Sequence, residues 1–352
     1  MVEITNVDSH KLMYHPERVA EYKSKKDCYP IYIEIGLTNA CNHKCVFCAL
    51  DYLENGGIFF NKEVLLLNLK LMAEKGVKSI MFAGEGEPLL HKDIGLFVQK
   101  AKEYGIDISI TTNGILFDES KIEQCLPYLS WIRFSIDAGT PESYAKIHGT
   151  NEEDFLKLMN NIQNAVEFKN NNKLDVTIGA QFLMISHNLN EAKILAEKLK
   201  EIGTDNLQIK PYSHHPKSLN DFSVGIEEQN RIRDELKHFD SENFKILFRK
   251  STIERINDGI NYPECYGLPF FVLIDSKGNV IPCNLHYGTP EFIYGNLYEK
   301  NFQEIWESER RKMIIKKLKE KGVSECRKGC RLDSINRYLH RLKNPLGHDN
   351  FI

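Results

Sequence analysis

Three cysteines on one short loop are the residues of this chain best suited to do chemistry. Cys41, Cys45 and Cys48 follow a strand-like run at 31–35 with the spacing C-x-x-x-C-x-x-C, and we call residues 41–48 the cysteine loop. A structural zinc site needs four ligands, and no fourth cysteine or suitably placed histidine follows closely. His43 has polar neighbours and is interpreted as a solvated loop residue. Three thiolates suit three corners of a four-iron cluster whose fourth iron stays open to a molecule that is not protein.

This spacing, with the aromatic Phe47 directly before the third cysteine, resembles the signature of the radical S-adenosylmethionine (SAM) superfamily. The resemblance implies a [4Fe-4S] cluster whose open iron chelates the amino and carboxylate groups of SAM. One electron from the cluster would cleave the sulfonium to a 5'-deoxyadenosyl radical, which abstracts hydrogen from a substrate. It also implies a reducing partner such as flavodoxin or ferredoxin.

Length and composition narrow the class of protein. The 352 residues suit one barrel-sized domain plus a smaller one, and 42% hydrophobic with 27% charged residues indicates a folded chain. A formal net charge of -3 gives no reason to expect nucleic acid. The N-terminal residues lack a secretion-signal pattern, and no run of 18 apolar residues occurs. We therefore expect a cytoplasmic protein without a membrane or nucleic-acid partner, whose nine cysteines are metal ligands or free thiols.

Strand-like and helix-like patterns alternate from residue 30 to about 212, which predicts parallel β/α units. The expected strands are 31–37, 79–83, 107–112, 131–137, 174–183 and 206–211. The expected helices are 61–75, 92–104, 118–129, 155–169 and 190–202. Six units fit the partial (β/α)6 TIM-like barrel that the resemblance implies, an α/β fold with functional residues at the C-terminal strand ends.

We predict three parts of the chain. Residues 1–29 form an N-terminal arm with one short helix, 30–240 form the radical SAM partial barrel, and 241–352 form a small C-terminal α+β domain that binds an auxiliary cluster.

The segment after the second expected strand resembles the family's G-x-G-E-P variant of the segment that binds the SAM amino group. Gly84 and Gly86 would permit close backbone approach, and Glu87 would accept hydrogen bonds from the ammonium. Gly-Glu and Pro also form ordinary turns, which is the alternative interpretation.

The ends of the third and fourth expected strands also resemble family segments at the cofactor. Ser135 is a candidate for a hydrogen bond to the methionine carboxylate or ribose, and Asn113 and Asp137 would line the mouth of the barrel. A turn at Asn113 and a helix N-cap region at Asp137 are the structural alternatives.

Four further cysteines form a second constellation near the C-terminus, at Cys265, Cys283, Cys326 and Cys330. Apolar runs that flank a turn at 276–279 predict a hairpin that brings Cys265 and Cys283 together, and a helix is expected from 301 to about 321. The block resembles the SPASM/twitch extension of radical SAM enzymes. Four cysteines suffice for one fully ligated [4Fe-4S] cluster, so the resemblance implies two clusters in all, and zinc is the alternative at this second site.

Several polar residues near the ends of the fifth and sixth expected strands would face the cavity: Gln181, Lys210, Tyr212, His214 and His215. The two histidines are candidate substrate contacts or acid/base groups, with simple exposure as the alternative.

We expect an oxidoreductase-type radical SAM enzyme that acts on a small polar molecule such as a sugar, an aminocyclitol or a nucleotide sugar. The arm at 1–29 is too short for the leader-peptide module of many peptide-modifying relatives, and one auxiliary cluster could accept the electron left after hydrogen abstraction. A peptide or protein maturase that makes an epimer, a crosslink or an oxidised side chain is the alternative.

Overall fold

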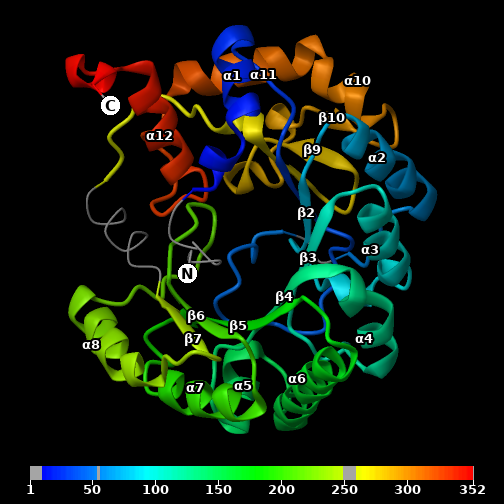
Figure 1. The fold of residues 1–352 in the computed structure, drawn as a ribbon, viewed down its shortest axis with the longest axis vertical. Coiled ribbons are helices and arrows are strands. Elements are labelled where there is room, and N and C mark those ends of the chain that lie inside the picture. Colours follow the sequence, from blue (N-terminus) through cyan, green and yellow to red (C-terminus); the bar gives the residue numbers. More distant parts are fainter. Residues whose placement is uncertain (1–9, 54–55, 249–258, 352) are drawn as a thin grey trace.

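The computed structural model describes residues 10–53, 56–248 and 259–351. Its centre is one curved sheet of ten strands in the order β10-β9-β8-β1-β2-β3-β4-β5-β6-β7 (Figure 1). The strands are β1 Tyr32–Ile35, β2 Ser79–Phe82, β3 Asp107–Thr112, β4 Leu129–Ser135, β5 Thr177–Met184, β6 Asn206–Pro211, β7 Lys245–Phe248, β8 Phe271–Ile274, β9 Asn279–Ile281 and β10 Gly295–Asn296. All neighbours from β8 to β7 are parallel, and β9 and β10 are antiparallel additions at one end.

Helices cover the outside of the curved sheet (Figure 1). They are α1 Pro16–Lys25, α2 Lys62–Glu74, α3 Ile94–Glu103, α4 Glu119–Cys125, α5 Pro141–His148, α6 Glu152–Asn172, α7 Glu191–Ile202, α8 Ile226–Leu236, α10 Phe302–Glu307, α11 Glu309–Lys321 and α12 Asp333–Lys343. Alternate strand residues such as Ile33, Phe134 and Ile209 pack in the core beneath these helices. Because side chains alternate along a strand, the residues between them face the inside of the barrel.

The expected α/β fold, the partial barrel and its first six β/α units are confirmed. Two further parallel strands flank those units, one on each side. β7 pairs with β6, and β8 pairs in parallel with β1, so the sheet continues across the predicted boundary at 240. β8 covers the backbone groups that β1 would otherwise expose as an edge strand.

The C-terminal elements follow the sequence pattern in part. The expected hairpin forms between β8 and β9. The expected single helix from 301 is divided into α10 and α11 at Ser308, whose hydroxyl caps α11 by accepting from the Arg311 backbone N–H. No helix in the described part of the chain is long and apolar enough to cross a membrane.

The N-terminal arm packs firmly against the C-terminal part. Leu12, Val19 and Tyr22 share a buried cluster with aromatic and aliphatic residues from beyond residue 260. The fully buried Arg311 forms a bidentate ion pair with Asp27, with N···O distances of 2.7 and 2.8 Å. The arm therefore ties the start of the barrel to helix α11.

Candidate active site

The cysteine loop is held by the C-terminal end of α5. The Lys44 N–H donates to the His148 carbonyl at 2.9 Å, and the Val46 N–H donates to the Ile147 carbonyl at 3.0 Å. Carbonyls in the last turn of a helix have no partner within the helix, so the loop satisfies them. Gly149 follows with φ 59°, and a Cβ there would lie 2.4 Å from the Lys44 carbonyl oxygen. Only glycine allows this approach.

The three thiols of the loop lie close to one another and partly open to solvent. Cys41 and Cys48 are exposed and Cys45 is half-buried. Burial of the sulfur atoms raises the pKa of Cys41 to about 11 and that of Cys45 well above its usual range, and repulsion between neighbouring thiolates raises both further. Backbone N–H groups of His43 and Asn42 act on Cys41 in the opposite direction. Converging thiols with N–H donors aimed at sulfur fit an iron–sulfur cluster, whose thiolate ligands accept such bonds.

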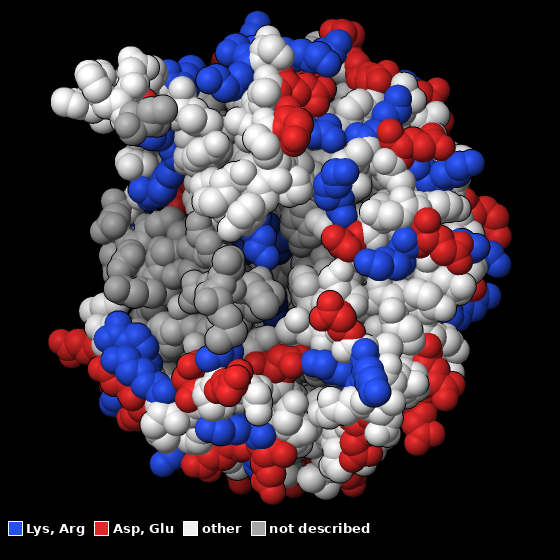
Figure 2. All heavy atoms as spheres, viewed as in Figure 1, with Lys and Arg blue, Asp and Glu red and all other residues white. Residues whose placement is uncertain are grey.

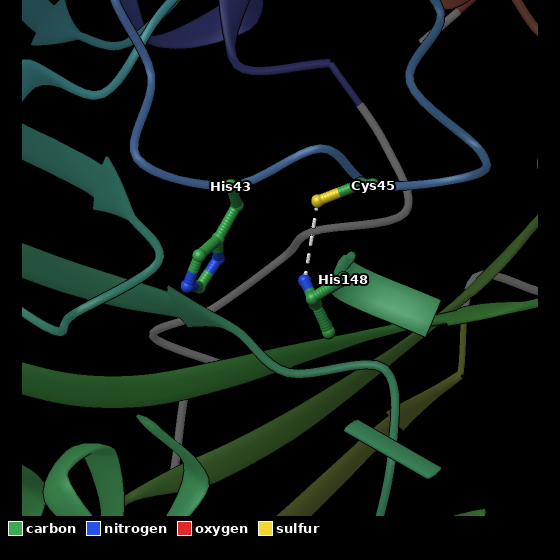
Figure 3. A group of neighbouring side chains, drawn as sticks. All are labelled: His43, Cys45 and His148. Carbon is green, nitrogen blue, oxygen red and sulfur yellow. Dashed lines mark hydrogen bonds between the residues drawn. The ribbon is translucent and has the colours of Figure 1, made fainter. Parts of the chain in front are cut away.

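His43 does not lie in solvent, so its interpretation as a solvated loop residue is wrong. Its side chain is buried, with Nε2 3.3 Å from Asp154 Oδ2 and the ring edge-on to Tyr144. The residues at the start of α6 cover it, a tertiary contact that polar neighbours in sequence do not reveal. His43, Cys45 and His148 bring their ligand atoms within 4.8 Å of one another (Figure 3).

The glycine-rich segment after β2 approaches the cysteine loop closely. A Cβ on Gly86 would lie 2.3 Å from the Ala40 carbonyl oxygen, and the Glu87 N–H donates to that carbonyl at 2.8 Å. Gly84 adopts φ 124° beside Gly36. Both glycines therefore allow backbone segments of the protein to pack together, and their predicted contact with SAM stays a prediction.

Glu87 is buried and connects the ends of two strands. Its carboxylate accepts from the Leu89 N–H at 3.0 Å, from Thr112 Oγ1 at 2.6 Å and from the Asn113 N–H at 2.8 Å. Burial raises the pKa of Glu87, and these three donors oppose the shift. A carboxylate has about four acceptor positions, so one remains for an ammonium group. The predicted bond to SAM is compatible with this count.

The remaining predicted cofactor contacts lie nearby. Asn113 Nδ2 donates to Asn42 Oδ1 at 2.7 Å, which links β3 to the cysteine loop. Ser135 faces the inside of the barrel. Asp137 is 0% exposed and accepts from the Leu183 N–H at 2.6 Å, and burial raises its pKa to about 7. The N-cap of α5 is Thr140, so Asp137 does not cap that helix.

Phe47 contacts a residue that the sequence analysis missed. Its ring lies edge-on to His148, with the ring centroids 5.5 Å apart. His148 Nδ1 in turn lies 3.2 Å from Cys45 Sγ. The sequence offered only a histidine before a glycine at the end of a helix, and nothing in that pattern points to the cysteine loop.

The four C-terminal cysteines also come together, from three separate segments. Burial raises the pKa of the Cys283 thiol most, and the thiolates of the other three cysteines raise it further. Asn336 Nδ2 lies 3.5 Å from Cys265 Sγ, and the Leu332 N–H donates to Cys330 Sγ at 3.4 Å. The hairpin β8–β9 brings Cys265 and Cys283 to its open end, as its sequence predicted. Four converging thiols with N–H donors fit a fully ligated cluster.

The two histidines after β6 stabilise a loop. His215 is buried, so the alternative of simple exposure is wrong for it. Its Nδ1 accepts from the Lys217 N–H at 3.2 Å, and its Nε2 lies 3.3 Å from the Asn284 carbonyl oxygen. His214 is exposed, with Nδ1 2.9 Å from the Asn220 carbonyl oxygen. Both nitrogens of His215 are thus engaged within the protein, which disfavours an acid/base role.

Comparison with known proteins decides the family. Residues 35–199 match the radical SAM superfamily, and residues 265–331 match SPASM, an iron–sulfur cluster-binding domain. The chain therefore carries a radical SAM domain followed by a SPASM domain. These two domains imply SAM and [4Fe-4S] clusters as cofactors, as the sequence analysis expected. The assignment of the two cysteine groups as the cluster ligands stays a prediction.

Curated relatives of this radical SAM chain include probable GTP 3',8-cyclases. The protein from Saccharolobus solfataricus is 27% identical over 219 residues, which cover 62% of this chain and 67% of the relative. The protein from Methanocaldococcus jannaschii is 29% identical over 216 residues, which cover 60% of this chain and 69% of the relative.

Two solved structures share the fold. Streptococcus suis SuiB bound to its precursor peptide SuiA superposes with a TM-score of 0.67 at 18% identity, covering 85% of this chain and 70% of SuiB. The enzyme anSMEcpe with bound AdoMet superposes with a TM-score of 0.58 at 20% identity, covering 89% of this chain and 95% of anSMEcpe. At such identities the likeness shows the fold alone.

Proposed function

We propose that this radical SAM enzyme abstracts hydrogen from a small polar molecule held inside the barrel, in a dehydrogenation or related redox reaction that uses one auxiliary cluster. When bound, the first cluster and SAM supply a 5'-deoxyadenosyl radical that removes a hydrogen atom from the substrate. A reduced flavodoxin or ferredoxin would deliver the electron. The names of the curated relatives state a nucleotide substrate, GTP, which is also a small polar molecule.

The inner face of strands β4 to β6 supports a polar substrate. Ser135, Gln181 and Gln208 lie side by side in register across these three strands. Their neighbours in sequence, such as Phe134, Phe182 and Ile209, pack outward in the core, so this row faces the inside of the barrel. Figure 2 shows blue Lys and Arg atoms in the hollow at the middle of the face it presents.

Gln208 carries the proposal. Its side chain is 0% exposed, and within the described part of the chain neither its amide nitrogen nor its amide oxygen has a hydrogen-bond partner. Leaving such a group buried and unpaired costs about 1–3 kcal/mol. A substrate that both donates and accepts hydrogen bonds would satisfy the amide and recover that free energy.

Lys210 adds a positive charge to the same wall. It lies two residues after Gln208 on the same face of β6, and its charge lowers the pKa of Asp137, so the lysine lies near the end of β4. An amide beside an ammonium group suits hydroxyl, carbonyl or anionic oxygens. It suits apolar peptide side chains poorly, because they would leave the amide unpaired.

The substrate class can be tested with fractions of a cell extract. Reconstituted protein is reduced without oxygen, and formation of 5'-deoxyadenosine is followed with a small-molecule filtrate, before and after exhaustive protease treatment. We expect stimulation that survives the protease. Stimulation that the protease destroys would favour the peptide maturase, the class suggested by the peptide complex of SuiB.

A matched pair of variants tests the role of the buried amide. Gln208→Leu keeps the volume of the side chain and removes its hydrogen-bonding atoms, so the stimulation by the filtrate should fall while cleavage of SAM without substrate persists. Gln163→Leu, on the exposed face of α6, is the control and should behave like the parent. Undiminished stimulation in Gln208→Leu would contradict the proposed substrate wall.

A further inference from the structure

His148 lies directly beside the middle cysteine of the cysteine loop (Figure 3). Its Nδ1 is 3.2 Å from Cys45 Sγ, and the side chain is 1% exposed. The imidazole stacks on Tyr144 with the ring centroids 4.2 Å apart and the planes 25° apart, and Phe47 meets it edge-on. Packing on these sides fixes the orientation of the ring.

The other ring nitrogen determines which nitrogen carries the proton. The Asp137 backbone N–H donates to His148 Nε2 at 3.3 Å. A backbone N–H is always a donor, so Nε2 presents its lone pair to it. The Asp137 carboxylate oxygen Oδ2 lies 3.6 Å from Nε2, which is too long for a hydrogen bond that would hold a proton on that nitrogen. The proton of the imidazole then lies on Nδ1. A protonated imidazolium would place two N–H groups against each other at Nε2. The geometry therefore directs Nδ1–H at the sulfur of Cys45.

Cys45 has a main-chain donor in its own backbone N–H, and it also faces a side-chain group from another element of the fold. The backbone N–H groups of Asn42 and His43 donate hydrogen bonds to Cys41, and the backbone N–H of Leu50 donates one to Cys48. Those donors are main-chain groups of the loop and its continuation. His148 comes from α5, more than 100 residues further along the chain, and it is the side-chain donor to Cys45 among the described residues.

The same helix end also fixes the loop itself. The carbonyl of His148 accepts from the Lys44 N–H, so the main chain of this residue holds the loop while its side chain faces the sulfur. The close approach of Gly149 to Lys44 leaves little room for the helix to shift. The distance from Nδ1 to Sγ is thereby set by the backbone, and a substitution of the side chain leaves the docking bonds in place.

We propose that His148 is a positioning residue that tunes the SAM-binding cluster: its Nδ1–H donates a hydrogen bond to the Cys45 thiolate and raises the reduction potential of that cluster. Reduction adds one electron to the cluster and increases the negative charge on its sulfur atoms. A hydrogen-bond donor stabilises the more negative state, and hydrogen bonds to sulfur are among the features that set cluster potentials. The tautomer that makes this possible is fixed by the Asp137 N–H, in the way that second partners orient metal-ligating histidines.

The test is an anaerobic redox titration of the reconstituted protein, followed by electron paramagnetic resonance (EPR). His148→Phe keeps a buried aromatic ring and removes the donor. The signal of the SAM-binding cluster is recognised because it changes on addition of SAM, and the auxiliary signal is an internal reference. We expect a more negative midpoint in His148→Phe. At the parent's midpoint, the ratio of reduced to oxidised cluster should fall by roughly three- to tenfold, the effect of one hydrogen bond.

Two further variants separate the hydrogen bond from packing. Tyr144→Phe keeps the stacked ring and should leave the midpoint unchanged. His148→Gln offers an amide N–H at a similar reach and should recover part of the shift. An unchanged midpoint in His148→Phe at full iron content would overturn the proposal.

A measurement on the unaltered protein covers the case in which His148→Phe assembles too little iron. With ¹⁵N-labelled histidine, the signal of the reduced SAM-binding cluster should show a hyperfine coupling to a histidine nitrogen that His43→Gln retains. Absence of this coupling would equally overturn the proposal, whatever happens to the variant.

Discussion

The two cysteine sites of this chain differ in the number of their cysteines and in how far apart those cysteines lie in the sequence. The first has three cysteines on a loop of eight residues, two of them exposed, so a cluster bound there would keep one corner without a protein ligand. The second gathers four cysteines from three segments that span residues 265–330, and the sulfur atoms of Cys265, Cys283 and Cys330 are more deeply buried than those of the cysteine loop. An open site can be local in sequence because its last ligand is not protein. A closed site requires that the tertiary fold bring distant segments together.

The two sites also share a feature. Each has a side-chain N–H group near one of its sulfur atoms, from His148 to Cys45 at 3.2 Å and from Asn336 to Cys265 at 3.5 Å. In both cases the donor comes from a helix rather than from the segment that carries the cysteine. We infer that the helices orient the ligands, while the loops supply them.

The largest expected effect follows from removal of the open site. Replacement of Cys41, Cys45 and Cys48 together by Ala should lower the iron content from about eight to about four atoms per chain, since each cubane holds four. Cleavage of SAM should be abolished. Iron analysis and the yield of 5'-deoxyadenosine measure the two outcomes. Retained cleavage of SAM in this variant would falsify the assignment of the open site.

Removal of the closed site should act on substrate turnover alone. A variant with Cys326→Ala and Cys330→Ala should retain about four iron atoms and still cleave SAM, because the auxiliary cluster has no vacant iron. Product formation should be lost. Circular dichroism should match that of the parent, since loss of a cluster can also cost folding free energy. Undiminished product formation by a folded variant would show that the second cluster is dispensable.

A smaller effect is expected at the cofactor pocket. Glu87→Gln keeps the shape of the buried side chain and removes its charge, so the affinity for SAM should weaken by about 1–2 kcal/mol. Thr112→Val is the control, because it removes one internal bond to Glu87 and leaves the carboxylate in place. Titration calorimetry at equal iron content measures both. Equal affinity in Glu87→Gln and the parent would refute the predicted role of this residue.

The smallest effect should distinguish the two side-chain donors. Asn336→Leu removes the donor to Cys265 and the acceptor of the Gly267 N–H, which lies 2.7 Å from Asn336 Oδ1. We expect a more negative midpoint potential for the auxiliary cluster. At the parent's midpoint, the ratio of reduced to oxidised auxiliary cluster should fall by about a few-fold. The SAM-binding cluster should not respond. A shift of both midpoints would indicate a general loosening of the structure.

The sequence predicted local elements better than their surroundings. The first six β/α units and the β8–β9 hairpin followed from spacing and alternation, which are local patterns. Spacing also indicated seven candidate cluster cysteines, whose role as ligands stays a prediction. β8 pairing with β1 could not be predicted, because strand order depends on contacts between residues some 240 positions apart. For the same reason His148 and the burial of His43 were missed: each depends on how α5 and α6 pack against the cysteine loop.

The roles of the predicted SAM contacts depend on a further level of detail. Glu87 was chosen because a carboxylate can bind an ammonium group, yet the structure shows three donors from the protein on the same carboxylate. Sequence pattern gives the residue type at the strand end. It does not give the number of acceptor positions that the fold itself uses.

The contrast between an open and a closed cluster is tested most directly by EPR of the two cysteine variants with and without SAM. Addition of SAM should change the signal of the reduced Cys326→Ala and Cys330→Ala variant, in which only the open cluster remains. It should leave the signal of the triple variant of the cysteine loop unchanged, because all four corners of the auxiliary cluster are ligated by protein. A SAM-dependent change in the triple variant would contradict the account, because the second cluster would then also present an open iron.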